Sequence, residues 1–170
     1  MACLLVDEEY KIVNEFNEFC RPHSFKYWDD EAQAIHGITR ERCEQFQSGM
    51  AMLLTFKKFL RQEQFFGICH AAFRTNMNKY FDYEFLRNHC LLYNQFHEII
   101  YGSIPQCGST ILRNADFELI RNAPESQGLS AWAKFLNYKF SHHNALDDCY
   151  ATLEVFKHLI KQGVRFNANN

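Results

Sequence analysis

The sequence has no run of apolar residues that approaches the length of a membrane span, and its formal net charge is only −2 at pH 7. Its first residues, MACLLVDEE, lack the basic start and the small-residue cleavage site of a secretory signal peptide. The near-neutral charge excludes a broadly basic nucleic-acid-binding surface, so any basic surface must be local. We therefore expect a protein without a membrane segment.

The chain also lacks any C-x-x-C pair, although it contains seven cysteines. They are scattered along the chain, at Cys3, Cys20, Cys43, Cys69, Cys90, Cys107 and Cys149. An odd number without close pairs is typical neither of a disulfide framework nor of a structural zinc site. The pattern predicts a reduced protein in the cytoplasm or another reducing intracellular compartment.

What the sequence does contain is typical of one globular domain over residues 1–170. Of these 170 residues, 47% are hydrophobic and 16% aromatic, which is enough to bury a substantial core. There is no internal repeat, low-complexity tract or long linker. A single domain is therefore the expected organisation.

Strand and helix patterns alternate along this domain. Strands are predicted on both sides of a turn at Asp7-Glu8-Glu9, and a buried strand at 64–73. A polar segment leads to Thr39, a predicted N-cap. Helices are expected at 40–46, 49–62, within 76–96, at 129–140 and at 144–163, with Gly163 as a C-cap. Residues 109–120 fit either type of element. Interleaved strands and helices predict an α/β fold.

The segment HHNALDDCYAT, residues 142–152, places two histidines and two aspartates at the start of the last predicted helix. Asp148 provides a carboxylate of the kind that binds Mg²⁺ or Mn²⁺, and His143 an imidazole able to deprotonate water. Taken alone, the segment is equally typical of an ordinary helix start with exposed histidines, since acids are favourable near the positive end of a helix.

Two further motifs precede it. In Asn78-Lys79-Tyr80-Phe81-Asp82, the acid opens a helix after an apolar strand, where α/β sheets often place binding groups. The alternative is that Asp82 caps the helix and Phe81 belongs to the core. In Ile35-His36-Gly37-Ile38-Thr39, the glycine permits a tight turn before the capped helix.

In this order, I-H-G-I-T, N-x-x-F-D and H-x-A-x-x-D resemble the DEDDh branch of the 3′–5′ exonucleases, which includes polymerase proofreading subunits. The resemblance covers most of the chain. It implies a ribonuclease-H-like mixed sheet flanked by helices. It also implies hydrolysis of phosphodiester bonds at DNA or RNA 3′ ends with two Mg²⁺ or Mn²⁺ ions.

By this resemblance Asp82 and Asp148 hold metal, His143 is the general base, and Asn78 and Phe81 contact nucleic acid. His142 and Asp147 have the same spacing one residue earlier. Ala145 favours the register of His143 with Asp148, because the family has a small residue two positions after its histidine.

The family's first motif, D-x-E on a central strand, has no clear counterpart. Asp7 and Glu9 spell it, but they fall where a hairpin turn is expected, too close to His36 for three strands. We therefore expect a domain that is N-terminally truncated relative to the family, its first central strand missing. Three hypotheses follow. The first is an active exonuclease, either through Asp7 and Glu9 as a rescued acid pair or because the full gene product is longer. The second is an inactive relative that binds nucleic acid or a protein, and the third is a subunit whose sheet is completed by a second copy or a partner peptide.

Overall fold

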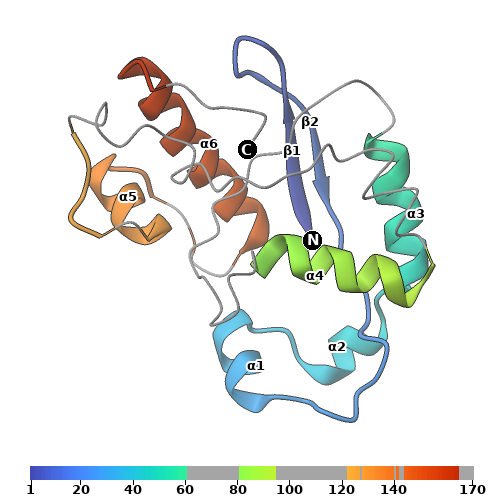
Figure 1. Ribbon diagram of the computed structural model, residues 1–170. Coiled ribbons are helices and arrows are strands. Elements are labelled where there is room, and N and C mark those ends of the chain that lie inside the picture. The colour runs from blue at the N-terminus through green and yellow to red at the C-terminus, as the bar shows by residue number, and fades with distance from the viewer. Residues whose placement is uncertain (61–80, 95–121, 127, 140, 142–143, 165–170) are drawn as a thin grey trace.

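The computed structural model describes residues 1–60, 81–94, 122–126, 128–139, 141 and 144–164. Within these ranges the chain forms two strands and six helices (Figure 1). The strands are β1 (Ala2–Val6) and β2 (Ile12–Asn17). The helices are α1 (Asp30–His36), α2 (Arg40–Glu44), α3 (Gly49–Leu60), α4 (Phe81–Leu92), α5 (Leu129–Phe135) and α6 (Ala145–Lys161). This arrangement confirms the predicted α/β class.

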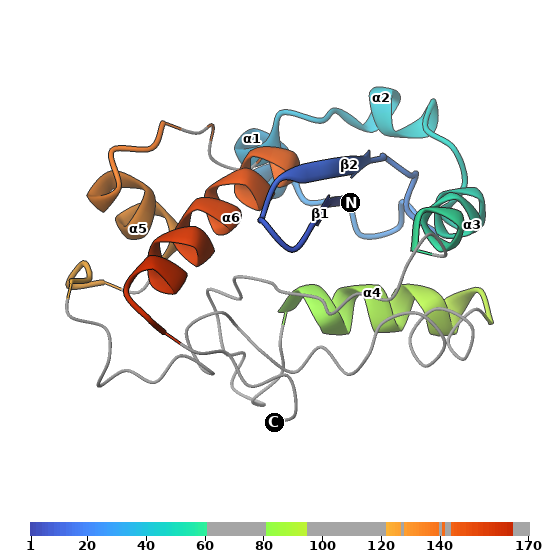
Figure 2. The ribbon, with the colours of Figure 1, turned by 90° about the horizontal axis from the view of Figure 1, so that it is seen from above.

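The two strands form an antiparallel hairpin, as predicted. Ala2 pairs with Asn17 and Val6 with Ile12, and the register shifts between Leu5 and Val6. Figures 1 and 2 both show the hairpin between α6 on one side and α3 on the other. In the described part of the chain, β1 and β2 are the strands of the sheet.

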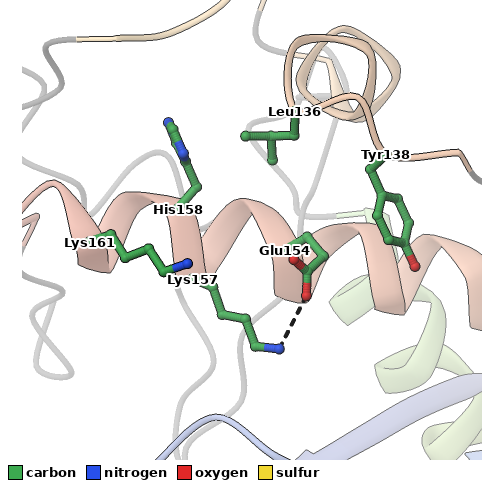
Figure 3. Close-up of a pocket in the computed structure, with 6 residues that line it drawn as sticks. All are labelled: Leu136, Tyr138, Glu154, Lys157, His158 and Lys161. Carbon is green, nitrogen blue, oxygen red and sulfur yellow. Dashed lines mark hydrogen bonds and ion pairs between the residues drawn. The ribbon is translucent and has the colours of Figure 1, made fainter.

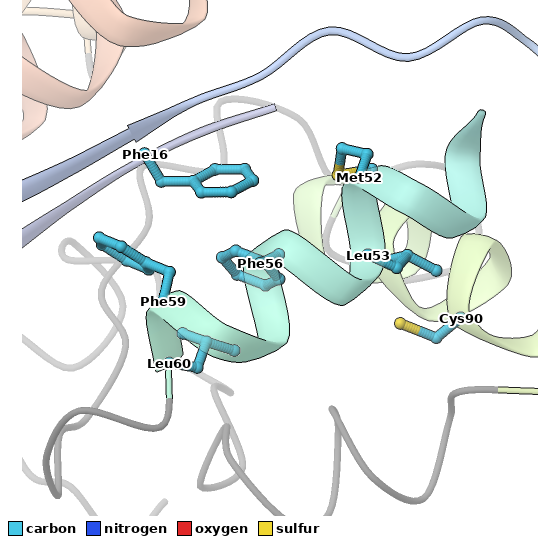
Figure 4. Packing of buried hydrophobic residues seen from close by; sticks show 7 residues of the cluster. All are labelled: Phe16, Met52, Leu53, Phe56, Phe59, Leu60 and Cys90. Carbon is cyan, nitrogen blue, oxygen red and sulfur yellow. The ribbon is translucent and has the colours of Figure 1, made fainter. Parts of the chain in front are cut away.

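The hairpin separates two hydrophobic cores. The first core consists of Phe16, Met52, Leu53, Phe56, Phe59, Leu60 and Cys90 (Figure 4). The second core consists of Trp132, Leu153, Val155, Phe156, Leu159 and Val164. Because side chains alternate along a strand, Cys3 and Leu5 pack against the first core and Leu4 and Val6 against the second. β1 therefore has apolar contacts on both faces, which explains why it is apolar throughout.

The sequence pattern does not predict helix α1, because its residues lie in the polar segment before Thr39. It begins at an N-cap, Asp29, whose carboxylate accepts from the backbone N–H groups of Glu31 and Ala32. It ends at Gly37, which adopts a left-handed conformation with φ of 71°. None of its residues is buried, so it carries no apolar periodicity that would reveal it. The predicted tight turn at Gly37 is confirmed.

The remaining helices follow the sequence pattern, except that α5 ends at Phe135, short of the predicted end at residue 140. Thr39 caps α2 by accepting a hydrogen bond from the Arg42 N–H, as predicted. Helix α3 buries the five apolar residues at helical spacing, Met52, Leu53, Phe56, Phe59 and Leu60. Helix α6 packs against β1 and α5, and the chain turns away at Gly163, which has a φ of 83°. Of the helices described, none is long and apolar enough to span a membrane.

Candidate active site

The first turn of α6 carries both candidate aspartates. Asn144 caps the helix, its side-chain oxygen accepting from the N–H groups of Leu146 at 3.1 Å and Asp147 at 3.4 Å. The Asp148 N–H donates to the Asn144 carbonyl at 2.9 Å, which closes the first helical turn. This cap fixes where α6 begins and therefore the direction in which each aspartate leaves the helix.

The two aspartates lie on different faces of α6. Both aspartates are half-buried, but Asp148 shares a face with the buried residues Val155 and Leu159, which follow it at helical spacing. Asp147 is on the face of Tyr150 and Glu154 instead. Asp148 therefore belongs to the side of the helix that faces the domain interior.

Asp147 already has a local structural role. Its carboxylate accepts a hydrogen bond from the Ser141 N–H at 3.3 Å, which ties the preceding loop to the helix. It also lies close enough to Tyr138 to contribute to the raised pKa of that phenol, after burial and Glu154. Asp147 therefore holds the preceding loop, whereas Asp148 lies on the interior face of α6. The H-x-x-x-x-D spacing alone does not make this distinction.

A contact that the sequence did not reveal joins α6 to the hairpin. The Tyr150 hydroxyl on α6 donates to the Glu15 carboxylate on β2. This hydrogen bond is the largest cause of the raised pKa of Tyr150. No motif links residues so distant in the chain. The contact fastens α6 to the sheet two residues beyond Asp148.

The other predicted site residues are only partly located. Asp82 and Phe81 are in the first turn of α4, but only the backbone is described there. Figure 1 superimposes this end of α4 on the start of α6, while Figure 2 shows the two ends apart. His142, His143 and Asn78 lie outside the described residues. Their predicted roles therefore stay predictions.

The D-x-E sequence at Asp7 forms the predicted turn. The Asp7 carboxylate accepts from the N–H groups of Glu9 and Lys11, both at 2.9 Å. Glu9 forms an exposed ion pair with Lys11, and Tyr10 has a positive φ of 62°. These contacts account for both carboxylates without a metal ion. A metal-binding role for Asp7 or Glu9 stays a prediction that the turn does not support.

The described residues do not by themselves form a metal site. Within these ranges, no three side chains of His, Cys, Asp or Glu are arranged so that they could hold an ion. A Mg²⁺ site depends on several well-placed oxygen ligands. Asp148 would therefore need partner ligands from Asp82, from the segments not described or from another chain.

Comparison with known proteins shows the family of the chain. The exonuclease family of the RNase T type matches residues 1–156. This chain belongs to that family. The crystal structure of cell-death related nuclease 4 (CRN-4) matches it with a TM-score of 0.61 and 14% sequence identity. The match covers 97% of this chain and 57% of that nuclease, and at this identity it shows a shared ribonuclease-H-like fold. No curated protein matches the chain.

Helix α4 of this exonuclease-family domain is anchored at its far end by His89. The His89 Nε2 lies 3.9 Å from the Cys20 Sγ, and its ring makes an edge contact with Tyr93. Burial lowers the pKa of His89 and raises that of Cys20. Both side chains are therefore neutral near pH 7, which suits a packing role. The anchor holds the C-terminal end of α4 against the start of α3.

A small pocket lies on the other side of α6. It has a volume of about 140 Å³ and is lined by Leu136, Tyr138, Glu154, Lys157, His158 and Lys161 (Figure 3). Lys157 is already paired with Glu154 at 3.1 Å. Since these α6 residues continue the face of Asp147 and not that of Asp148, the pocket is separate from the candidate site.

Proposed function

We propose that the chain acts on the 3′ ends of nucleic acids as a 3′–5′ exonuclease of the DEDDh type. The family match supports nuclease chemistry, and the observation that carries the finer assignment is the placement of Asp148. A metal ligand on α6 has to lie on the side of the helix that faces the rest of the domain, where further ligands can reach the same ion. Asp148 is the member of the Asp147-Asp148 pair that lies on the interior face of α6.

In this proposal Asp148 and Asp82 hold Mg²⁺ or Mn²⁺, and His143 removes a proton from the attacking water. The ions, when bound, stabilise negative charge at the phosphorus and help to generate hydroxide. Asp148 is suited to this task because the Asn144 cap and the Tyr150–Glu15 contact fix the helix that carries it. The roles of Asp82 and His143 rest on the motif alone.

The proposed substrate is single-stranded DNA or RNA, with Asn78 and Phe81 contacting the terminal nucleotide. The proposed location is a reducing compartment, since Cys3, Cys20, Cys43, Cys90 and Cys149, the cysteines among the described residues, are not in disulfides. A second copy of the chain or a protein partner would complete the sheet and supply the remaining metal ligands.

A second candidate is a catalytically inactive exonuclease-like domain that binds nucleic acid or a protein. It is favoured by the finding that the described residues do not contain a group of three metal ligands. Such a protein would bind an oligonucleotide 3′ end without shortening it. Its affinity would fall with added salt if phosphate contacts dominate the binding.

The two candidates are separated by an assay on 5′-labelled single-stranded DNA and RNA. The chain is incubated with Mg²⁺ or Mn²⁺, and parallel samples contain a chelator. The exonuclease predicts a 3′-shortening ladder that requires the metal. An intact oligonucleotide that is retained by folded protein in a binding assay would instead support the inactive domain.

A further inference from the structure

Three aromatic residues lie close together in the connection from β2 to α1. They are Phe25, Tyr27 and Trp28, in the sequence RPHSFKYWDD. The Tyr27 ring is 84% exposed, and the Lys26 Nζ lies 5.0 Å from its centroid. A large aromatic ring exposed to this degree contributes little to folding, because it removes little apolar surface from water. Tyr27 is therefore free to contact a ligand.

The neighbouring rings are held in place. Phe25 and Trp28 have ring centroids 5.9 Å apart, and the Arg40 guanidinium lies 5.2 Å from the Phe25 centroid. The Trp28 Nε1 donates to the Gln33 side chain at 3.0 Å. These contacts fix two of the three aromatic residues before any ligand binds, which lowers the entropy cost of binding.

Both ends of the connection are also fixed. Its start is tied to the segment before α3, since the Arg21 N–H donates to the Gln47 carbonyl at 2.9 Å. Its end is Asp29, the N-cap of α1. Figures 1 and 2 both show α1 beside the N-terminal end of α6, the end that carries Asp148. The aromatic connection therefore leads to the helix next to the candidate site.

Charge around these rings is mixed. Lys26 and Arg40 lie over the aromatic faces, while Asp30 and Glu31 are exposed in the first turn of α1. A ligand held chiefly by phosphate contacts would be repelled by these acids. A ligand held chiefly by stacking would not, because every nucleic-acid base offers a π face.

We propose that Phe25, Tyr27 and Trp28 form a stacking platform for unpaired bases of a single-stranded nucleic acid whose 3′ end enters the candidate site. Tyr27 is the exposed ring on which a base stacks. Lys26 and Arg40 strengthen the platform by neutralising the adjacent phosphates. This inference rests on the proposed function, because it names the part of the substrate that lies outside the site.

Binding without cleavage provides the test. A fluorescent single-stranded oligonucleotide is titrated with the full chain in the presence of a chelator, so that hydrolysis does not contribute. Tyr27→Ala should raise Kd about tenfold, which lies within the range of effects expected when one stacking ring is removed. Tyr27→Phe keeps the ring and should bind like the unsubstituted chain. Lys26→Gln should also raise Kd, because it removes a charge that neutralises the adjacent phosphates. Lys11→Gln, in the hairpin turn, is its matched control and should leave Kd unchanged.

Tryptophan fluorescence gives a second readout. The chain has two tryptophans, and Trp132 is fully buried in the second core. Quenching by the oligonucleotide should therefore come from Trp28 and disappear in Trp28→Phe.

The outcomes distinguish the platform from the proposed function. Equal binding by the unsubstituted chain and by Tyr27→Ala would overturn the platform, even if the chain degrades DNA. Failure of the unsubstituted chain to bind any single strand would also overturn it. Loss of binding in Tyr27→Ala, with rescue in Tyr27→Phe, would support the platform even if no hydrolysis occurs in the presence of metal.

Discussion

The Tyr150 hydroxyl on α6 donates a hydrogen bond to the Glu15 carboxylate on β2 and so joins residues 135 positions apart in the chain. The contact lies two residues beyond Asp148, and the Asn144 cap lies four residues before it. Asp148 is thus bracketed by two points at which α6 is fixed. The position of the candidate metal ligand is set by the junction of helix and hairpin.

Ionisation of Tyr150 should report this contact directly. The hydrogen bond to Glu15 raises the pKa of Tyr150 above the ordinary value of 10.0. The stability that the raised pKa contributes is therefore complete below pH 10 and is lost as the pH rises through the folded-state pKa. Ultraviolet titration measures this ionisation as the difference between the curves of the unsubstituted chain and Tyr150→Phe. The Tyr150 phenol should ionise at a pH above its ordinary pKa. Glu15→Gln should bring its pKa down, and an unchanged curve would refute the assignment.

Close packing at the start of α3 predicts that Gly49 does not tolerate a larger side chain. A Cβ at Gly49 would lie 2.5 Å from the His89 Nε2 and 2.7 Å from the Tyr93 Cε2. Gly49→Ala should therefore lower the free energy of unfolding by about 1–3 kcal/mol, as overpacked sites do. Denaturant unfolding measures the effect. Ala51→Gly, in the same helix, is a control for helix propensity, with an expected loss of about 1 kcal/mol.

His89 should make the fold sensitive to acid. Burial lowers its pKa below the ordinary 6.5, with the N-terminal amine as a minor contributor and a hydrogen bond with the Gly49 backbone opposing the shift. Its contribution to stability is present above pH 6.5 and is lost as the pH falls through the folded-state pKa. His89→Gln should flatten the decline in stability between pH 7 and 5, whereas exposed His36→Gln should not. Equal slopes in both variants would contradict the prediction.

The turn at Asp7 should matter for stability and not for activity. Asp7→Ala removes the acceptor of two backbone N–H groups and should cost about 1 kcal/mol of unfolding free energy. Thermal unfolding measures this loss, and the nuclease ladder should persist at temperatures where the variant is folded. Loss of the ladder in a fully folded Asp7→Ala protein would instead make Asp7 a metal ligand.

The helices that bury an apolar stripe were predictable from the sequence. Leu153 and Phe156 in α6, and Leu53 and Phe56 in α3, recur at helical spacing, and each lies in a core. Helix α1 was not predictable in this way because it buries no residue. Its boundaries are visible only in its caps, Asp29 and Gly37.

For the candidate site, the sequence predicted the segment 142–152, and the choice of register within it rested on one residue. His142 with Asp147 and His143 with Asp148 have equal spacing, and only Ala145 distinguished them. The phase of α6 relative to its buried residues is a tertiary property that separates the two aspartates. The Tyr150–Glu15 contact was equally invisible, because it depends on how α6 lies across the hairpin.

The most direct test of the central claim compares Asp148→Asn with Asp147→Asn on 5′-labelled single-stranded DNA and RNA in Mn²⁺. Circular dichroism first establishes that both variants are folded. The account predicts that the unsubstituted chain and Asp147→Asn shorten the strand from its 3′ end. Asp148→Asn should lose this activity at least a hundredfold, in line with the loss of an essential catalytic group. A ladder of equal strength from folded Asp148→Asn would contradict the assignment of Asp148 as a metal ligand.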